Sequence, residues 1–485
     1  MIAWSIYVSL AGAVVTLLLP RVLSRWLALA TALLGLAFGI NGFFQSHTLF
    51  AQFATLVRVP WIPAIGSSYH LAADGISLTM VLVTGVTAVS AVLFSWKIEN
   101  RPNEFFFWLL LVLAGSYGVF LSADLFLLFV FYELVIIPKY FLIATWGSTN
   151  KEYGAMKLTL YSFFGGVLVF IGILLIYANA RSFDLQTLAT YPFDLRTQLT
   201  TFPILFLGFA VLAGIWPLHT WAPTGHVAAP TAGSMLLAGI VMKLGAYGAL
   251  RVALNLLPLG FLAWNKWIAI LGVIGIVYAA GVALRQADLK FVIGYSSVSH
   301  MGFVLLGFAT GNLLGVSGAV LQMFSHGVIG GLLFALAGAM YQRTHTRNLD
   351  DLSRLQLSRT MPFLAFAFVA ASAASMGIPG FSGFAAEITV LIGVWKTFPI
   401  AVWITGIGMM LVAAFTLRAL KKSFFGEPRG PIPGYSADLS AEPATVAEKF
   451  GACFLIFVTL AIGLYPRLIF DRIMPAIETM RFLQR

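Results

Sequence analysis

The stretch TAGSMLLAGIVMKLGAYGALRVALN, residues 231–255, decides the fold class of this sequence. It is long enough to cross a bilayer, because a membrane helix needs about 20 predominantly apolar residues. Lys243 stands near its middle, too deep for its ammonium group to reach water easily at either end. An ionisable side chain at such a depth is costly, and its presence usually marks function. The stretch therefore predicts a membrane helix that carries a functional lysine.

Composition extends this interpretation to the whole chain. Of the 485 residues, 60% are hydrophobic and only 10% are charged, whereas a soluble domain carries about 25% charged residues. The net charge is +11, but the basic residues are scattered singly between apolar runs, as in the loops of membrane proteins, so we exclude nucleic-acid binding. The single cysteine, Cys453, cannot hold an iron–sulfur cluster or form an internal disulfide.

Fourteen apolar runs predict an all-α integral membrane protein with about 14 transmembrane helices. Their approximate cores are 3–19, 25–43, 75–96, 105–121, 125–147, 157–178, 199–216, 231–255, 265–284, 291–309, 313–340, 361–392, 399–420 and 451–470. The first run lacks a basic leader and a cleavage site, so we expect a retained span. The stretch 44–74 is too polar to span and is expected on one membrane face, and 421–449 is expected to be a polar linker.

The loops also predict an orientation. Most lysines and arginines fall in odd-numbered loops, Arg21, Lys97 and Arg251 among them. Cytoplasmic loops are enriched in these residues, so we expect the odd loops in the cytoplasm and both termini outside. The basic C-terminal tail argues mildly against this orientation.

Two spans are interrupted, the seventh by Pro217 and the twelfth by Pro379 and Gly380. Proline breaks the helical hydrogen-bond ladder, and open backbone at membrane depth must be buried in protein or line a wet cavity. Prolines are also simply common in membrane helices. Breaks at matching places in two halves nevertheless favour an inverted-repeat transporter. We expect N-terminal helices at 1–104, five-helix repeats at 105–256 and 257–420, and a linker with the last helix at 421–485.

Two carboxylates accompany Lys243 as candidates for proton transfer. Glu133 lies roughly 13 Å along a helix that crosses about 30 Å, where a carboxylate either functions or satisfies an interhelical hydrogen bond. Glu387 follows the break in the twelfth span and either ends a polar path or caps a half-helix. Burial disfavours the charged form of an amine, which is the property that a proton relay needs of Lys243.

Three histidines, His219, His300 and His326, lie at or within spans seven, ten and eleven. Histidine titrates near neutral pH and suits a proton shuttle, although a lone membrane histidine is often only a packing residue. Lys290, at the start of span ten, either anchors the helix at the interface or closes a chain of ionisable groups. No cluster has the spacing of a metal site.

Several motifs occur together in this chain. They are Tyr132-Glu133-Leu134 with Pro138 and Tyr140–Gly147, Pro217-Leu218-His219-Thr220-Trp221, Leu236-Leu237-Ala238-Gly239-Ile240 with Lys243, Tyr295–Gly302, and Gly377-Ile378-Pro379-Gly380 with Gly383-Phe384 and Glu387. In order and spacing they resemble the antiporter-like membrane subunits of complex I, the proton-pumping NADH:quinone oxidoreductase. The likeness covers roughly residues 70–425, and one helix after the bundle resembles subunit M rather than subunit L.

The resemblance implies an antiporter-like fold with inverted repeats and discontinuous helices 7 and 12. It implies that Glu133 is the input carboxylate, Lys243 the central lysine and Glu387 the terminal acid. It places His219, His300, His326 and Lys290 in or beside the polar axis. It further implies a bacterial inner membrane, other complex I membrane subunits as partners, and quinone, flavin and iron–sulfur clusters in partner subunits, with no cofactor in this chain.

One departure from the family concerns the input site. The family pairs the helix-five glutamate with a helix-seven lysine, but Leu212 occupies that position. Helix five instead carries Lys139, which on an ideal helix is about 120° away from Glu133. Lys139 either replaces the missing partner, or reaches an interface and leaves the site altered, or marks a diverged paralogue with weakened pumping.

Other functions are compatible with parts of this sequence pattern. The same fold occurs in multisubunit sodium/proton antiporters and in membrane-bound hydrogenases, and fold alone does not separate them. An independent transporter of an organic solute would need a substrate-sized pocket. A purely structural scaffold would have no use for Lys243 and Glu133 at membrane depth.

Overall fold

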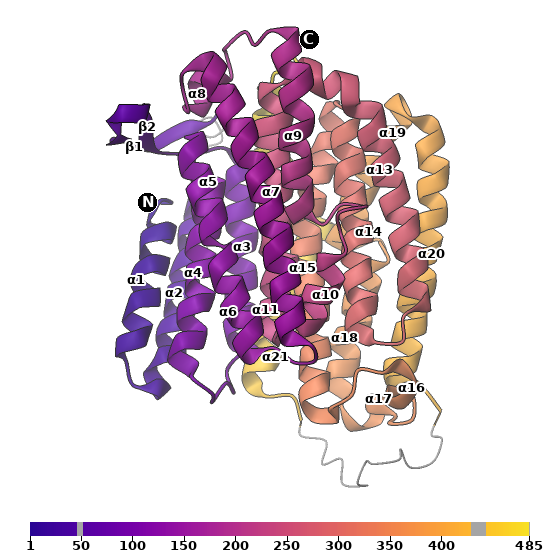
Figure 1. Cartoon of the computed structure of the whole chain (residues 1–485). Coiled ribbons are helices and arrows are strands. Elements are labelled where there is room, and N and C mark those ends of the chain that lie inside the picture. Colours follow the sequence, from indigo (N-terminus) through magenta and orange to yellow (C-terminus); the bar gives the residue numbers. More distant parts are fainter. Residues whose placement is uncertain (46–51, 428–442, 485) are drawn as a thin grey trace.

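The computed structural model describes residues 1–45, 52–427 and 443–484, and in them the chain is an almost entirely helical slab of upright helices (Figure 1). Twelve helices are long and apolar enough to cross a membrane. The shorter helix α1 and the interrupted pair α18 and α19 complete fourteen spans. The predicted multi-pass, all-α membrane architecture is confirmed.

The spans follow the predicted runs closely. They are α1 (Trp4–Leu18), α2 (Arg21–Phe44), α3 (Gly75–Leu93), α4 (Pro102–Leu121), α5 (Leu125–Leu134) with α6 (Ile136–Trp146), α7 (Lys151–Ala180), α9 (Leu195–Ala213), α11 (Thr231–Leu236) continued by η2 (Leu237–Val241), α12 (Met242–Gly248) and η3 (Ala249–Leu254), α13 (Pro258–Arg285), α14 (Leu289–Ala309), α15 (Leu313–Thr344), α18 (Pro362–Ser375) with α19 (Ser382–Thr397), α20 (Pro399–Phe424) and α21 (Val446–Leu464). Segments η2 and η3 are π-helical. Short helices are η1 (Pro63–Ile65), α8 (Leu185–Leu188), α10 (Trp221–Ala228), α16 (Leu349–Leu352), α17 (Leu357–Thr360) and α22 (Arg467–Glu478).

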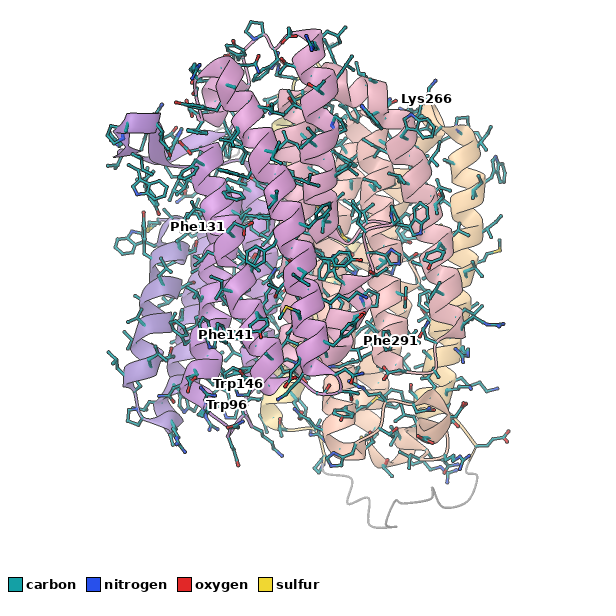
Figure 2. All side chains as sticks on the ribbon, viewed as in Figure 1. Trp96, Phe131, Phe141, Trp146, Lys266 and Phe291 are labelled. Atoms are coloured by element: carbon teal, nitrogen blue, oxygen red, sulfur yellow. The ribbon has the colours of Figure 1, made fainter. Side chains whose placement is uncertain are left out.

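Burial separates inner from outer helices. The helix from Thr231 to Leu254 and α15 are enclosed by protein along their spans, and α3 and α14 nearly so. In the most apolar part of α7, α13, α20 and α21, fewer than half of the residues are buried. Trp96 and Trp146 lie near one end of the bundle (Figure 2), as expected of aromatic residues at a membrane interface. The helix that carries Lys243 is therefore central, and no lipid headgroup solvates its middle.

Both predicted helix breaks are confirmed. Helix α9 stops at Gly214, whose φ of +68° is left-handed, and a loop with Pro217 leads into α10. Helix α18 gives way to a loop with Pro379 and Gly380, whose φ is +100°. Glycine adopts these angles without steric cost, and proline ends the ladder. The structure thus opens two helices partway along their spans, and Pro217 and Pro379 are exposed at these breaks.

The polar stretch 44–74 forms a β-hairpin that the sequence did not reveal; its residues 46–51 lie outside the described chain. Strand β1 (Ala54–Ile62) pairs antiparallel with β2 (Ser67–Ala73). The hairpin projects at the end of the bundle where the C-terminus lies (Figure 1). Pro60 and Pro63 obscure the alternation that would identify a strand.

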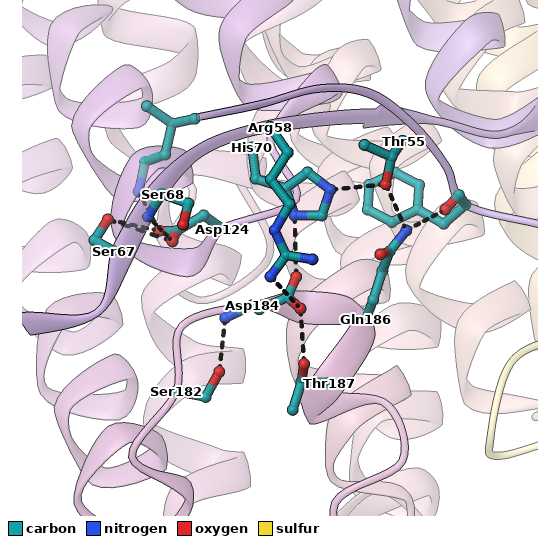
Figure 3. Close-up of polar contacts among 12 residues, drawn as sticks. Thr55, Arg58, Ser67, Ser68, His70, Asp124, Ser182, Asp184, Gln186 and Thr187 are labelled. Atoms are coloured by element: carbon teal, nitrogen blue, oxygen red, sulfur yellow. Dashed lines mark hydrogen bonds and ion pairs between the residues drawn. The ribbon is translucent and has the colours of Figure 1, made fainter. Parts of the chain in front are cut away.

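A polar cluster joins this hairpin to the loop before α8 (Figure 3). His70 is buried, with Nδ1 3.0 Å from Asp184 Oδ1 and Nε2 2.9 Å from Thr55 Oγ1. Thr187 donates a 2.7 Å hydrogen bond to Asp184, and Arg58 lies 3.4 Å from it. Burial raises the pKa of Asp184, but the hydrogen bonds from His70 and Thr187 and the charge of Arg58 outweigh burial and hold it at about 2.

We expect Asp184→Asn to loosen the hairpin. Hydrogen bonds to a charged group contribute about 1.5–3 kcal/mol, so hydrogen exchange of the β1 and β2 amides should accelerate at least about tenfold. Because the pKa of Asp184 in the folded protein lies below the ordinary value of 3.8, the stabilisation is complete at neutral pH and is lost as pH falls from about 4 to about 2. Asp194→Asn, in the next loop, is the control. Unchanged hairpin exchange in Asp184→Asn would contradict the anchoring role.

The C-terminal part differs from the prediction. Helix α20 extends to Phe424, and residues 428–442 of the predicted linker lie outside the described chain. The last span begins earlier than 451 and ends at Leu464, because Pro466 separates it from α22. Helix α22 was not predicted; it is amphipathic and packs its apolar face on α3 and α15.

Candidate functional site

Lys243 lies on α12 at the centre of the protein, and its side chain is fully buried. Its Nζ atom is 2.6 Å from Nδ1 of His326 on α15. It also donates to the carbonyl of Ala238 in η2, where the wider π-helical turn changes the backbone pairing. One of the two facing nitrogens must accept, so lysine and histidine share a proton between them. Two residues predicted separately are thus one pair.

His300 and Glu387 form a second cluster beside this pair. The ring centroids of His326 and His300 are 5.6 Å apart. His300 Nδ1 lies 3.2 Å from Glu387 Oε1 and 3.3 Å from Gln322 Nε2, and its Nε2 lies 3.3 Å from Ser375 Oγ. Because Nδ1 donates to the carboxylate or accepts from the amide, the ring has two alternative tautomers here. A small cavity is lined by all five side chains.

The break in the twelfth span makes room for Glu387. This residue is buried on α19. A Cβ atom placed on Gly377 would lie only 2.7 Å from Glu387 Oε2. The carboxylate therefore rests against the open backbone of the break instead of capping a half-helix.

Lys290 is buried, so its interpretation as an interfacial anchor is wrong. Its Nζ atom donates to the Ala229 carbonyl at 2.8 Å and lies 3.4 Å from Ser234 Oγ. Ala229 lies between α10 and α11, and Ser234 lies in α11. Asp288 caps the start of α14 and accepts the Lys290 backbone N–H at 2.7 Å. Lys290 thus ties α14 to the discontinuous seventh span.

His226 on α10 is a buried histidine that the sequence did not reveal. Its ring stacks on Phe334 at 4.3 Å, and neither ring nitrogen hydrogen-bonds to any described residue. The charges of Lys290 and Lys243 both act on it. His226 follows a stretch that proline interrupts. Without a regular apolar pattern there, the sequence does not indicate that His226 is buried in the membrane. Both of its ring nitrogens are free to bind or donate a proton within the described structure.

Glu133 lies near the end of α5, beside a one-residue interruption of the fifth span. The helix is interrupted at Val135 before α6 begins. Oxygen Oε1 has no hydrogen-bond partner among the described residues and faces Gly166 of α7, where a Cβ atom would collide with it. Neighbouring Tyr132 packs edge-to-face on Phe209 of α9 at 5.9 Å.

Lys139 is buried on α6, so the proposal that it reaches an interface is wrong. It lines a small cavity with Leu236 and Leu237 of the Lys243 helix. Its Nζ atom makes no hydrogen bond within the described residues. Lys139 and Glu133 form no ion pair within 4.0 Å, yet their charges interact. Leu212 on α9 is buried and supplies no charge.

Two glycine substitutions test the position of Glu133. Gly166→Ala should displace the carboxylate and slow proton translocation by the assembled complex about fivefold, because well-packed sites lose about 1–3 kcal/mol to an added methyl group. Gly281→Ala in α13 is the matched control, since its Cβ would meet nothing within 4 Å. Equal rates for the two variants would show that the geometry at Gly166 does not matter.

His219 is not brought to the central cluster. Its buried ring lies at the first break, 5.6 Å from the ring of Tyr278 and 6.1 Å from that of Tyr295. Its nitrogens have no hydrogen-bond partner among the residues described. The ring therefore packs between aromatic residues of α13 and α14.

Other buried charges are paired. Arg251, counted above as a loop residue, lies in η3 and forms a 2.5 Å ion pair with Asp74. Arg343 pairs with Glu448 at 2.7 Å. In the described ranges, no group of three or more His, Cys, Asp and Glu side chains could hold a metal ion. By contrast, among the described residues no ion pair within 4.0 Å with a carboxylate or a guanidinium group involves Glu133, Lys139, Lys243, Lys290, His219, His226 or His326. Such a set is suited to moving protons rather than to holding the fold.

This chain matches one family model and several known relatives. Residues 122–413 match the family model described as NADH:quinone oxidoreductase/Mrp antiporter, TM. NAD(P)H-quinone oxidoreductase chain 4 1 of Synechococcus elongatus is 37% identical over 453 residues, which cover 92% of this chain and 84% of the relative. A protein of the same name from a Picosynechococcus species is 36% identical over 457 residues, covering 92% and 84%.

Solved structures share the fold over the whole chain. A chain of respiratory complex I from Thermus thermophilus superposes with a TM-score of 0.89 at 25% identity and covers 100% of both chains. A chain of the Mrp complex from a Dietzia species gives 0.87 at 21% identity and covers 99% of this chain and 97% of that one. The latter likeness concerns the fold alone.

Proposed function

This chain belongs to the NADH:quinone oxidoreductase/Mrp antiporter family of membrane subunits, and from that membership we propose that it translocates protons as a subunit of a quinone-reducing complex. The relatives with the higher identity are named as chains of NAD(P)H-quinone oxidoreductase. The likeness to the Mrp complex is lower in identity, so the quinone-linked function is the better supported one.

The contact between Lys243 and His326 carries this proposal. Two nitrogens 2.6 Å apart in a fully enclosed site hold one proton between them. Placing a second positive charge there would be opposed strongly in a low-dielectric interior. A proton that arrives on one side therefore favours release on the other, which is the behaviour of a relay.

From this pair the path continues toward Glu387. His326 Nε2 has no hydrogen-bond partner among the described residues, and the ring centroids of His326 and His300 are 5.6 Å apart, so transfer between them needs a bridging water or a ring rotation. His300 then reaches the Glu387 carboxylate at 3.2 Å. We assign Glu387 as the terminal group and the His300 tautomers as the step before it.

On the opposite side of Lys243, Glu133 and Lys139 form the input. Lys139 lines the same cavity as residues of the Lys243 helix, whereas Leu212 offers no charge. We propose that Lys139 replaces the lysine that the family places at position 212. Lys290 and His226 form a branch that joins the relay at the seventh-span break, while His219 supports that break by packing.

The remaining assignments follow from the family. Other membrane subunits of the complex are the partners, and flavin, iron–sulfur clusters and quinone are bound by partner subunits. The complex resides in a bacterial inner membrane, with the odd-numbered loops cytoplasmic. Residues 105–256 and 257–420 are inverted five-helix repeats, an assignment supported by the open helix in each.

Purification of the tagged full-length chain in mild detergent tests the function. We expect quinone-binding and iron–sulfur subunits to co-purify, and the complex in liposomes to move protons when quinone is reduced. Co-purification with small antiporter subunits alone, together with sodium-driven proton movement without a redox donor, would overturn the proposal.

A further inference from the structure

A long apolar groove of about 840 Å³ lies on the outer surface between α13 and α20. Its walls are mostly aliphatic, formed by residues such as Ile270, Val273, Val277, Ile400 and Ile404. None of its described lining residues is acidic. None of them belongs to the proton path proposed above.

The groove has different chemistry at its two ends. Lys266, exposed near the end of the bundle where α13 begins (Figure 2), is its only charged described lining residue. Exposed Trp264 and Trp267 flank Lys266 in sequence, and exposed Trp403 lies on α20 between the groove residues Ala401 and Ile404. Tryptophan of this kind marks the headgroup level of a membrane. Lys266 therefore lies where phosphate groups of lipids lie.

The groove also has the depth of one lipid leaflet. Twelve residues separate Lys266 from Tyr278 along α13, which is about 18 Å of helix. Half of the hydrocarbon core of a bilayer is about 15 Å. Tyr278, at the far end, contacts Trp216 at 6.3 Å and His219 at 5.6 Å between ring centroids. An occupant of this length would run from the membrane surface to the break in the seventh span.

We propose that this groove holds one anionic phospholipid, with an acyl chain along α13 and the phosphate beside Lys266. Lys266 is the only cation among the described lining residues and complements an anionic headgroup, and the aliphatic wall complements a hydrocarbon chain. The lipid would support the Tyr278 side of the broken helix from outside.

Native mass spectrometry of the intact purified complex tests the site, with phosphatidylglycerol and phosphatidylcholine as the added lipids. Lys266→Gln should weaken retention of phosphatidylglycerol about fivefold, the effect of losing one cation beside an anionic headgroup, and leave phosphatidylcholine unchanged. Lys421→Gln is the control, because this exposed lysine lies in the last turn of α20 and does not line the groove. Ala401→Phe should fill the groove and remove one retained lipid per complex.

A cysteine probe decides between a lipid and a neighbouring subunit. The background for this probe is Cys453→Ser. In the assembled complex Ala401→Cys should react with a nitroxide label, because no other subunit covers it. Spin-labelled lipid added to the complex should show restricted motion beside this position. Unchanged lipid counts in both Lys266→Gln and Ala401→Phe would overturn the proposal. So would cross-linking of Ala401→Cys to another subunit, since the groove would then be a protein interface.

Discussion

Replacing Lys243 with methionine should slow proton translocation by the assembled complex at least about tenfold. Groups that transfer protons in enzymes typically contribute factors of about 10²–10⁴, and Lys243 has no substitute within hydrogen-bond reach of His326 in the described structure. Methionine keeps the volume and the packing, so assembly should persist. The measurement is proton uptake per quinone reduced in sealed vesicles.

The substitution Lys243→Arg distinguishes proton transfer by this side chain from an effect of its positive charge alone. Arginine retains a positive charge but does not release its proton in proteins. If Lys243 relays protons, arginine should be as inactive as methionine; if only its charge matters, arginine should restore most of the rate. Lys422→Met is the matched control, since Lys422 is a partly exposed lysine paired with Asp350 at the surface. Pumping within twofold of the parent in both Lys243 variants would remove Lys243 from the mechanism.

Replacing Lys139 with methionine should also slow pumping about tenfold, but without loss of stability. Lys139 Nζ is buried with no hydrogen bond to the described residues, and exchanging a buried charge for an apolar side chain is often neutral or stabilising. A structural lysine would behave in the opposite way, because its loss would lower the unfolding temperature. Pumping rate and unfolding temperature of the same preparation are therefore measured together.

A second substitution tests whether Lys139 stands in for the family lysine. Leu212→Lys in the Lys139→Met background should restore part of the rate, because position 212 lies one turn beyond Phe209, which contacts the neighbour of Glu133. Leu212→Met in the same background is the control for volume. Full pumping by Lys139→Met alone would show that Lys139 has no part in the input.

The helices and their breaks could be predicted because they depend on local chemistry. In lipid every backbone polar group must be satisfied within the span, so apolar length alone indicates a helix, and Pro217 and Pro379 indicate where it opens. The hairpin at 54–73 and helix α22 were not predicted, since both are stabilised by contacts with distant segments such as Asp184 and α15.

The candidate site was predictable only as a set of residues. Depth within apolar runs identified Glu133, Lys243 and Glu387, but it did not distinguish buried residues from boundary residues, as Lys290 and Arg251 show. His226 lies in a stretch without periodicity, so nothing local indicated that it is enclosed.

By itself the sequence determined a fourteen-span membrane protein with two open helices and ionisable groups at membrane depth. Only the tertiary structure decided which of those groups meet. Lys243 and His326 are 83 residues apart, and His300 reaches Glu387 from another helix. Such pairings arise from the packing of helices that are independent in sequence, because each helix satisfies its own backbone and leaves its side chains to be matched by its neighbours. The same helix packing also buries Lys243. Both properties that suit Lys243 to a proton relay, its contact with His326 and its burial, therefore result from that packing.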